Sequence, residues 1–98
     1  MSRLILVFAC AACLVGCKGP PVQDMSDARQ AIAAARAAGA ADLAPIELKA
    51  AQNALAAAES DIQLQRFTRA RLAAQDAKLH AGAALTHARQ SSAPPATQ

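Results

Sequence analysis

Three cysteines near the start of the chain carry its most reactive side chains. Cys10, Cys13 and Cys17 have the spacing C-x2-C-x3-C, which resembles part of a metal-binding or iron–sulfur motif. All three lie in or directly after an apolar stretch, and the sequence has no fourth cysteine to complete such a site. We therefore expect no metal and no other cofactor, and Cys17 must be explained by a different chemistry.

The residues before Cys17 have the organisation of a secretion signal. Arg3 gives a short positive start, residues 4–15 form an apolar run, and Gly16 is followed by Cys17 and the Gly-Pro-Pro sequence of residues 19–21. Signal peptides contain about 7–15 apolar residues, whereas a membrane-spanning helix needs about 20. Residues 1–16 therefore predict a signal peptide that is removed from the mature protein.

The sequence Leu14-Val15-Gly16-Cys17 resembles the lipobox of bacterial lipoprotein precursors. This resemblance implies cleavage between Gly16 and Cys17, a diacylglyceryl thioether on the Cys17 sulfur, and acylation of the new amino end by a fatty acid such as palmitate. Two acyl chains anchor a protein stably without any membrane span. An ordinary secretory signal with a coincidental cysteine is the alternative.

The residue after the lipobox bears on localisation. In enteric-type lipoprotein sorting, an Asp at this position favours retention in the inner membrane, and here the residue is Lys18. The resemblance therefore implies the inner leaflet of the outer membrane, facing the periplasm, with the inner membrane as the alternative.

The mature chain shows no arrangement typical of catalysis. His80 and His87 are seven residues apart, which on one helix is about 10 Å and too far to share a metal ion. We expect Asp76 and His80 to form a weak i, i+4 pair. There is no Gly-rich phosphate loop and no recognisable Ser–His–acid cluster, so we expect no catalytic residue and no small-molecule substrate. Helix capping is the expected role of the acidic residues Asp24, Asp27, Asp42, Glu47 and Asp61.

Charge and composition limit the partners. The net charge of +3 arises from 10 Lys and Arg mixed with 7 Asp and Glu, and the chain has no Trp or Tyr. A nucleic-acid partner is not expected, because there is neither a dense basic stripe nor an aromatic stacking platform. We expect membrane lipid as a partner through acylated Cys17. A protein partner or self-association is also expected, because alanine contacts bury little area.

The mature sequence predicts three helical stretches. Residues 17–23 form a lipidated, extended tether, and a helical domain covers residues 24–90. Its first helix is capped by Asp24 or Ser26 and ends at Gly39, residues 39–44 form a short connection, and Pro45 suits the first turn of the next helix. The third helix covers about residues 66–89, and residues 91–98 form a disordered tail.

Each stretch has an apolar stripe at helical spacing, which predicts its core face. The stripes are Ala28, Ile32 and Ala35 with Ala31 or Ala38; Leu48, Ala51, Leu55, Ala58 and Ile62; and Phe67, Ala70, Ala74, Ala77, Ala81 and Ala84, with Leu72 and Leu79 beside them.

The boundary between the second and third helices is less clearly marked. No Gly or Pro lies between Ser60 and Arg66, yet the spacing of Leu48 and Ile62 continues onto the charged Arg69 and Asp76. This break in the pattern favours a turn near residues 64–66, with one long helix as the alternative.

Residues 28–89 resemble the DUF4398 family of alanine-rich lipoprotein domains. The best marker is Leu43-Ala44-Pro45-Ile46-Glu47-Leu48, and further matches are Ala28-Arg29-Gln30-Ala31-Ile32, Ala37-Ala38-Gly39-Ala40, Leu55-Ala56-Ala57-Ala58-Glu59 and Arg66-Phe67-Thr68-Arg69-Ala70. The resemblance implies helical hairpins similar to single tetratricopeptide (TPR) units and carries no activity. Members often have Gly-Asp or Gly-Asn in the turn where this chain has Leu64-Gln65-Arg66.

These observations predict an all-α fold, either a small alanine-rich, TPR-like helical hairpin or a three-helix bundle, after an N-terminal signal helix. The expected function is that of a lipid-anchored periplasmic lipoprotein, a non-enzymatic structural or protein-interaction module of the cell envelope. The alternatives are a self-assembling coiled-coil spacer of the murein-lipoprotein type without covalent wall linkage, and a small toxin-like lysis lipoprotein.

Overall fold

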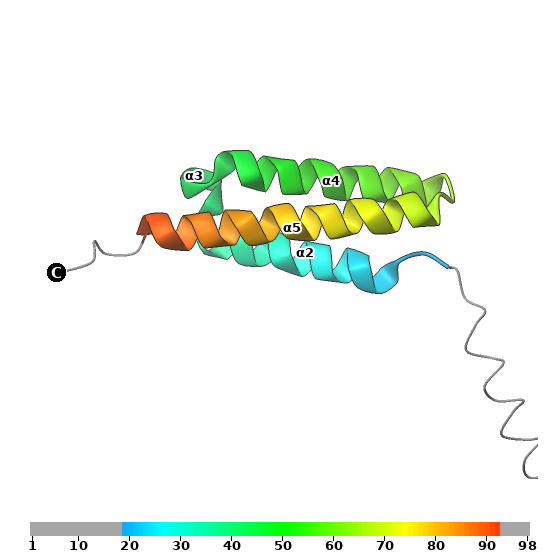
Figure 1. The fold of residues 1–98 in the computed structure, drawn as a ribbon, viewed down its shortest axis with the longest axis horizontal. Coiled ribbons are helices and arrows are strands. Elements are labelled where there is room, and N and C mark those ends of the chain that lie inside the picture. The colour runs from blue at the N-terminus through cyan, green and yellow to red at the C-terminus, as the bar shows by residue number, and fades with distance from the viewer. Residues whose placement is uncertain (1–18, 93–98) are drawn as a thin grey trace, which may run out of the picture.

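The described part of the computed structural model, residues 19–92, is built from four α-helices (Figure 1). They are α2 (Val22–Ala37), α3 (Ala40–Leu43), α4 (Pro45–Gln63) and α5 (Phe67–Ser92). This confirms the all-α class, and the three long helices form a bundle rather than a single hairpin. The predicted signal helix, Cys17, Lys18 and residues 93–98 lie outside the described residues.

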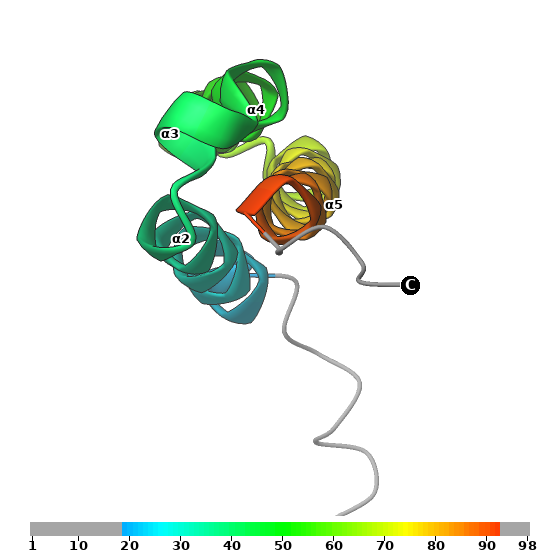
Figure 2. The same cartoon turned by 90° about the vertical axis from the view of Figure 1, so that its left-hand side faces the viewer.

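Helix α5 packs against both α2 and α4, and the three long helices lie at the corners of a triangle when viewed end-on (Figure 2). Helices α2 and α5 run in the same direction, and α4 runs opposite to them (Figure 1). The start of α2 and the turn between α4 and α5 therefore lie at one end of the bundle. Helix α3 and the end of α5 lie at the other end.

The buried residues of α2 and α5 follow alternating spacings of three and four, which is the spacing of coiled-coil core positions. Helix α4 keeps this spacing when half-buried Leu55 is counted with its buried residues. On α2 and α4, a large side chain alternates with alanine, as in Met25-x2-Ala28-x3-Ile32. On α5 every buried position is an alanine: Ala70, Ala74, Ala77, Ala81, Ala84 and Ala88. The large side chains of α2 and α4 pack against these alanines; Ile32 and Leu48 share one cluster with Ala81.

The first helix begins two residues earlier than the sequence predicts. The backbone N–H of Met25 donates to the carbonyl of Pro21 (2.9 Å), so Pro21 closes the first turn, and its side chain is buried. The expected capping by Asp24 or Ser26 is wrong, because α2 has no side-chain cap hydrogen bond. The tether is also shorter than residues 17–23, since Val22 and Gln23 are already helical.

The end of α2 follows the prediction. Gly39 adopts a left-handed conformation (φ +86°), and its N–H donates to the carbonyl of Arg36 (2.9 Å). A left-handed residue just after the helix is the usual glycine stop. The predicted connection contains the single-turn helix α3, and Pro45 occupies the first turn of α4 as expected.

The turn between α4 and α5 is confirmed, and one continuous helix is excluded. Gln65 has a left-handed backbone (φ 58°). The N–H of Arg66 donates to the carbonyl of Asp61 (2.7 Å), and the N–H of Gln65 donates to that of Ile62 (2.9 Å). This is the Schellman pattern of helix termination, built here without glycine.

The last helix differs from the prediction in two respects. It extends to Ser92, so Ser91 and Ser92 belong to α5 rather than to the tail. Leu72 and Leu79 are 63% and 72% exposed and do not extend the core. The alanine stripe and the leucine pair both repeat every seven residues, and the close approach of α2 and α4 selects the alanines.

Gln65→Gly is expected to raise the free energy of unfolding by up to about 1 kcal/mol, because glycine adopts the left-handed conformation without steric cost. The matched control Gln63→Gly, at the last residue of α4, should lower it by a similar amount. Urea unfolding of both variants checks this, and a loss of stability in Gln65→Gly would contradict the turn geometry.

Ala81→Leu should destabilise the bundle by about 1–3 kcal/mol, because Ala81 is fully buried between large side chains of α2 and α4. Ala83→Leu, on the exposed face of the same helix, is the control and should change stability by less than about 0.5 kcal/mol. Thermal unfolding followed by circular dichroism compares the two. Equal effects of both substitutions would refute the close-packed alanine core.

Candidate functional site

The residues with the most specific predicted chemistry, Gly16 and Cys17, lie outside the described residues, so cleavage and lipidation remain predictions. The structure does show where the bundle begins. Pro21 is buried against it, four positions after Cys17. Any group attached at Cys17 is therefore connected to the bundle by a very short stretch of chain.

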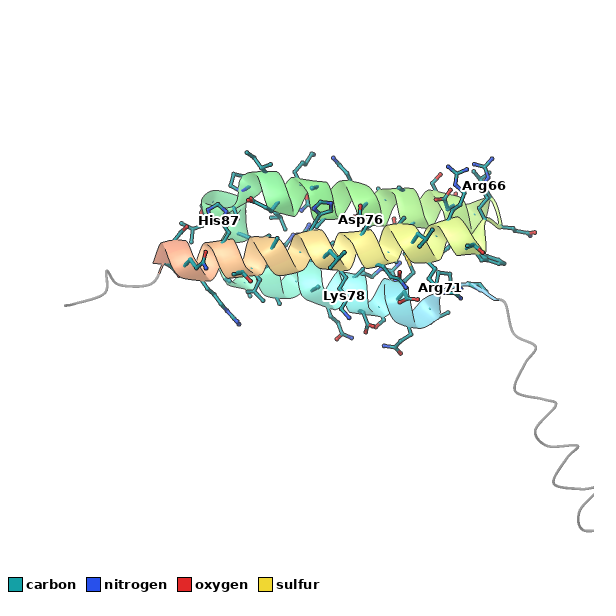
Figure 3. All side chains as sticks on the ribbon, viewed as in Figure 1. Arg66, Arg71, Asp76, Lys78 and His87 are labelled. Carbon is teal, nitrogen blue, oxygen red and sulfur yellow. The ribbon has the colours of Figure 1, made fainter. Side chains whose placement is uncertain are left out.

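Polar side chains connect the long helices along the edges of the core stripes. Arg71 Nε lies 3.5 Å from Asp24 Oδ2, Arg29 Nη2 lies 3.5 Å from Glu59 Oε1, and His87 Nδ1 lies 3.0 Å from Glu47 Oε1. These contacts join α5 to α2, α2 to α4, and α5 to α4. Figure 3 shows Arg71 and His87 on α5 at opposite ends of the bundle. Partly exposed pairs of this kind set the register of the helices more than they stabilise them.

The contact of Glu47 with His87 was not predicted. Glu47 lies in the first turn of α4, and its carboxylate accepts hydrogen bonds from its own backbone N–H and from His87. These two interactions, the backbone one first, lower the pKa of the Glu47 carboxyl below its usual range. The residues are 40 positions apart, so only the register between α4 and α5 brings them together.

The acidic residues do not cap the helices as predicted. Helices α2, α3 and α4 have no side-chain cap hydrogen bond. Asp24 contacts Arg71, and Asp27 accepts a hydrogen bond from Gln23 Nε2 (2.8 Å). The predicted pair within α5 is confirmed, with His80 Nε2 3.4 Å from Asp76 Oδ1.

One hollow of about 340 Å³ lies between α2 and α4, and we call it the α2–α4 groove. Buried Ile32 and half-buried Leu55 form its apolar part, and the contact between Arg29 and Glu59 crosses it. Its lining residues are Arg29, Ile32, Arg36, Gln52, Leu55, Ala56 and Glu59. An apolar strip flanked by guanidinium groups suits a partner that offers both apolar and acidic or carbonyl groups.

A second, open hollow of about 650 Å³ runs along α5 beside the start of α2. Its lining includes Gly82 and exposed Leu79 together with the charged residues Lys78 and Asp24. Figure 3 labels Lys78 on α5. A Cβ at Gly82 would meet no atom within 4 Å, so this part of α5 faces open space.

The described residues also show how side chains that could together hold a metal ion are distributed. Within residues 19–92 no three His, Cys, Asp or Glu side chains lie close enough together to hold a metal ion. The same residues include no buried polar or charged side chain. No helix of this part of the chain is long and apolar enough to cross a membrane. The surfaces described above can make apolar contacts, ion pairs and hydrogen bonds with another molecule.

Comparison with protein families gives one match. Residues 23–96 match the family model described as "Domain of unknown function (DUF4398)". The match includes nearly all of α2 and all of α3, α4 and α5. It agrees with the resemblance carried by residues 43–48. No curated protein and no solved structure matches the chain.

Glu47→Gln is expected to lower the melting temperature at neutral pH, because the neutral amide accepts a weaker hydrogen bond from His87 than the charged carboxylate does. The folded state lowers the pKa of Glu47, so this stabilisation is present above the ordinary carboxyl pKa of about 4.3 and is lost as the pH falls through the lowered value. Thermal unfolding over a range of pH should show the difference from wild type disappearing in acid. The control Asp42→Asn alters an exposed carboxyl in α3, at the same end, and should show no such pH-dependent gap. A gap that persists in acid would contradict this assignment.

Proposed function

Since the chain belongs to the DUF4398 family, whose description assigns no function, we propose a function from its own residues. The protein is a lipid-anchored lipoprotein of the cell envelope, and its helical bundle is a non-enzymatic structural or protein-interaction module. The observation that carries this proposal is the apolar run of residues 4–15, which ends in Gly16-Cys17 directly before the bundle.

The position of the bundle supports the anchor. A lipoprotein needs its lipidated cysteine at the first mature residue, with the folded domain after it. Here Pro21 already packs on the bundle, and the family match begins at residue 23. The proposed cleavage site therefore falls before the first residue that packs on the bundle, which is where a lipoprotein precursor must be cut.

We propose the inner leaflet of the outer membrane, facing the periplasm, as the location. Lys18 follows Cys17, so the chain lacks the Asp that favours retention in the inner membrane under enteric-type sorting. Gradient separation of the two membranes tests this location, and recovery in the inner membrane would refute it.

The surface of the bundle supports an interaction role. The core of α5 is alanine throughout, and large apolar side chains remain exposed on its outer face at Leu72 and Leu79. The α2–α4 groove adds a hollow with apolar and cationic groups. A self-assembling spacer would require one uninterrupted heptad helix, whereas turns at residues 38–39 and 64–66 divide this chain into antiparallel segments.

Cys17→Ser is expected to remove the lipid and to release the protein from the membrane fraction, because serine offers no thiol for the thioether. Membrane fractionation with intact mass measurement of the protein gives the readout. Wild type should show the added mass of a diacylglyceryl group and an amide-linked acyl chain.

Cys13→Ser is the matched control, because Cys13 lies in the segment that cleavage removes. This variant should remain acylated and membrane-bound. If Cys17→Ser were still acylated, or if wild type kept residues 1–16, the proposed anchor would be wrong.

A further inference from the structure

We propose that one end of the bundle rests on anionic phospholipid headgroups and acts as a second membrane contact beside the lipid on Cys17. This turn-end surface consists of Val22 at the start of α2 together with Leu64, Gln65, Arg66 and Arg69 at the turn between α4 and α5. The inference rests on the proposed function, which supplies the anchor, and adds the orientation of the bundle on the membrane.

The length of the tether limits where the bundle can lie. Val22 lies five positions after Cys17, and five fully extended residues span at most about 17 Å. Helix α5, with 26 residues, is about 39 Å long. The end that carries the start of α2 therefore stays close to the headgroups, while the opposite end can extend well away from them.

The structure brings two distant segments together at this end. Helices α2 and α5 are parallel, so the start of α2 lies at the same end as the turn after α4 (Figure 1). The contact between Asp24 and Arg71, 3.5 Å long, joins the first turn of α2 to the early part of α5. A lipid attached five residues before Val22 thus brings residues 64–69 to the membrane as well.

Apolar side chains at this end are suited to the headgroup region. Val22 is 72% exposed and Leu64 is 57% exposed, and neither contributes to the core. Phe67, directly after the turn, is only half-buried. Burying such side chains at a membrane interface is favourable in proportion to the apolar area removed from water.

The cationic side chains at this end lie where the dipole of helix α5 is unfavourable for positive charge. Arg66 and Arg69 flank the N-terminus of α5, where the helix dipole favours anions, and the first turn of α5 contains no acidic residue. Both arginines are exposed (Figure 3 labels Arg66). A phosphate group outside the protein would interact favourably with the guanidinium groups and with the free N–H groups of the first turn.

The acidic residues of this end do not cancel that charge. Asp24 contacts Arg71, and Glu59 contacts Arg29. Asp61 in the last turn of α4 and Asp27 of α2 remain as negative charges, against the positive charges of Arg66, Arg69 and Lys18, so this end keeps a small positive excess. Basic residues near an anionic membrane surface each contribute to attraction within about a Debye length.

The test uses the full acylated protein reconstituted in vesicles of phosphatidylglycerol and phosphatidylcholine in equal parts. Leu64→Cys places a fluorescent label at the turn-end surface, and Ile46→Cys, 81% exposed in the wild type, places the same label at the opposite end. Quenching by doxyl-labelled lipid and by aqueous iodide is measured for both. We expect severalfold stronger lipid quenching and weaker iodide quenching of the label at position 64. Equal iodide access at both positions would overturn the proposal.

The charge requirement is tested in the same vesicles. Replacing Arg66 and Arg69 by Gln should reduce lipid quenching of the label at position 64, and so should vesicles of phosphatidylcholine alone. The matched control replaces Lys49 and Arg89, both exposed near the opposite end, by Gln and should leave that quenching unchanged. Lipid quenching that stays the same both in the arginine variant and in vesicles of phosphatidylcholine alone would overturn the anionic-lipid assignment.

Two measurements keep the outcomes separate. Intact mass on the reconstituted sample reports acylation of Cys17, so an unacylated protein means that the proposed function itself fails. An acylated protein whose label at position 64 stays in water means that the second contact alone fails. Helical circular dichroism confirms folding of each variant, and Gln65→Cys provides a second labelling position in the same turn.

Discussion

The close approach that alanine permits on α5 is the constraint on which the rest of the bundle depends. Every buried position of α5 is alanine, so the large side chains of α2 and α4 can pack directly against its backbone from two sides. This arrangement leaves no room for large side chains on the inner face of α5. Leu72 and Leu79 therefore lie on the outer face, and Leu85 packs only partly buried at the edge of the core. The bundle gains stability from many small contacts rather than from a wide core.

The thin core also determines where polar groups and hollows occur. Helices held together by narrow stripes leave their flanks exposed. Those flanks carry the contacts of Asp24 with Arg71, Arg29 with Glu59, and Glu47 with His87. Each contact joins a different pair of long helices and so fixes their relative register. Where the flanks hold small residues instead, as at Ala56 and Gly82, the surface is hollowed. The grooves offered to a partner are thus a consequence of the same alanine content that forms the core.

The sequence was informative where a local signal decides the structure. Gly39 and Pro45 mark helix ends through their backbone preferences, and the break in the apolar pattern marks the turn at residues 64–66 even though Gln65 replaces the usual glycine. Prediction from the sequence failed for features that depend on how the helices pack against one another. Leu72 and Leu79 are seven residues apart, and so are Ala70 and Ala77. Only the distance between the packed helices determines that the alanines, and not the leucines, face the core. The contact of Glu47 with His87 was unpredictable for a similar reason, because it depends on the register of α4 against α5. Cys17 is the opposite case, since its predicted chemistry is read from the sequence motif alone.

With Cys17 anchored as proposed, the short tether and the direction of the helices together determine which surfaces a partner can reach. Both grooves run parallel to the long helices and not across an end of the bundle. Contact of one end with the headgroups therefore covers neither groove along its length. A partner in the periplasm could approach α2 and α4, or α2 and α5, from the side while the bundle stays on the membrane. A flexible tether of several tens of residues would not restrict the orientation of the bundle, because any of its faces could then turn toward the lipid. The short distance in sequence from Cys17 to Pro21, four positions later, thus has a structural consequence: it makes the lipid anchor restrict the orientation of the bundle.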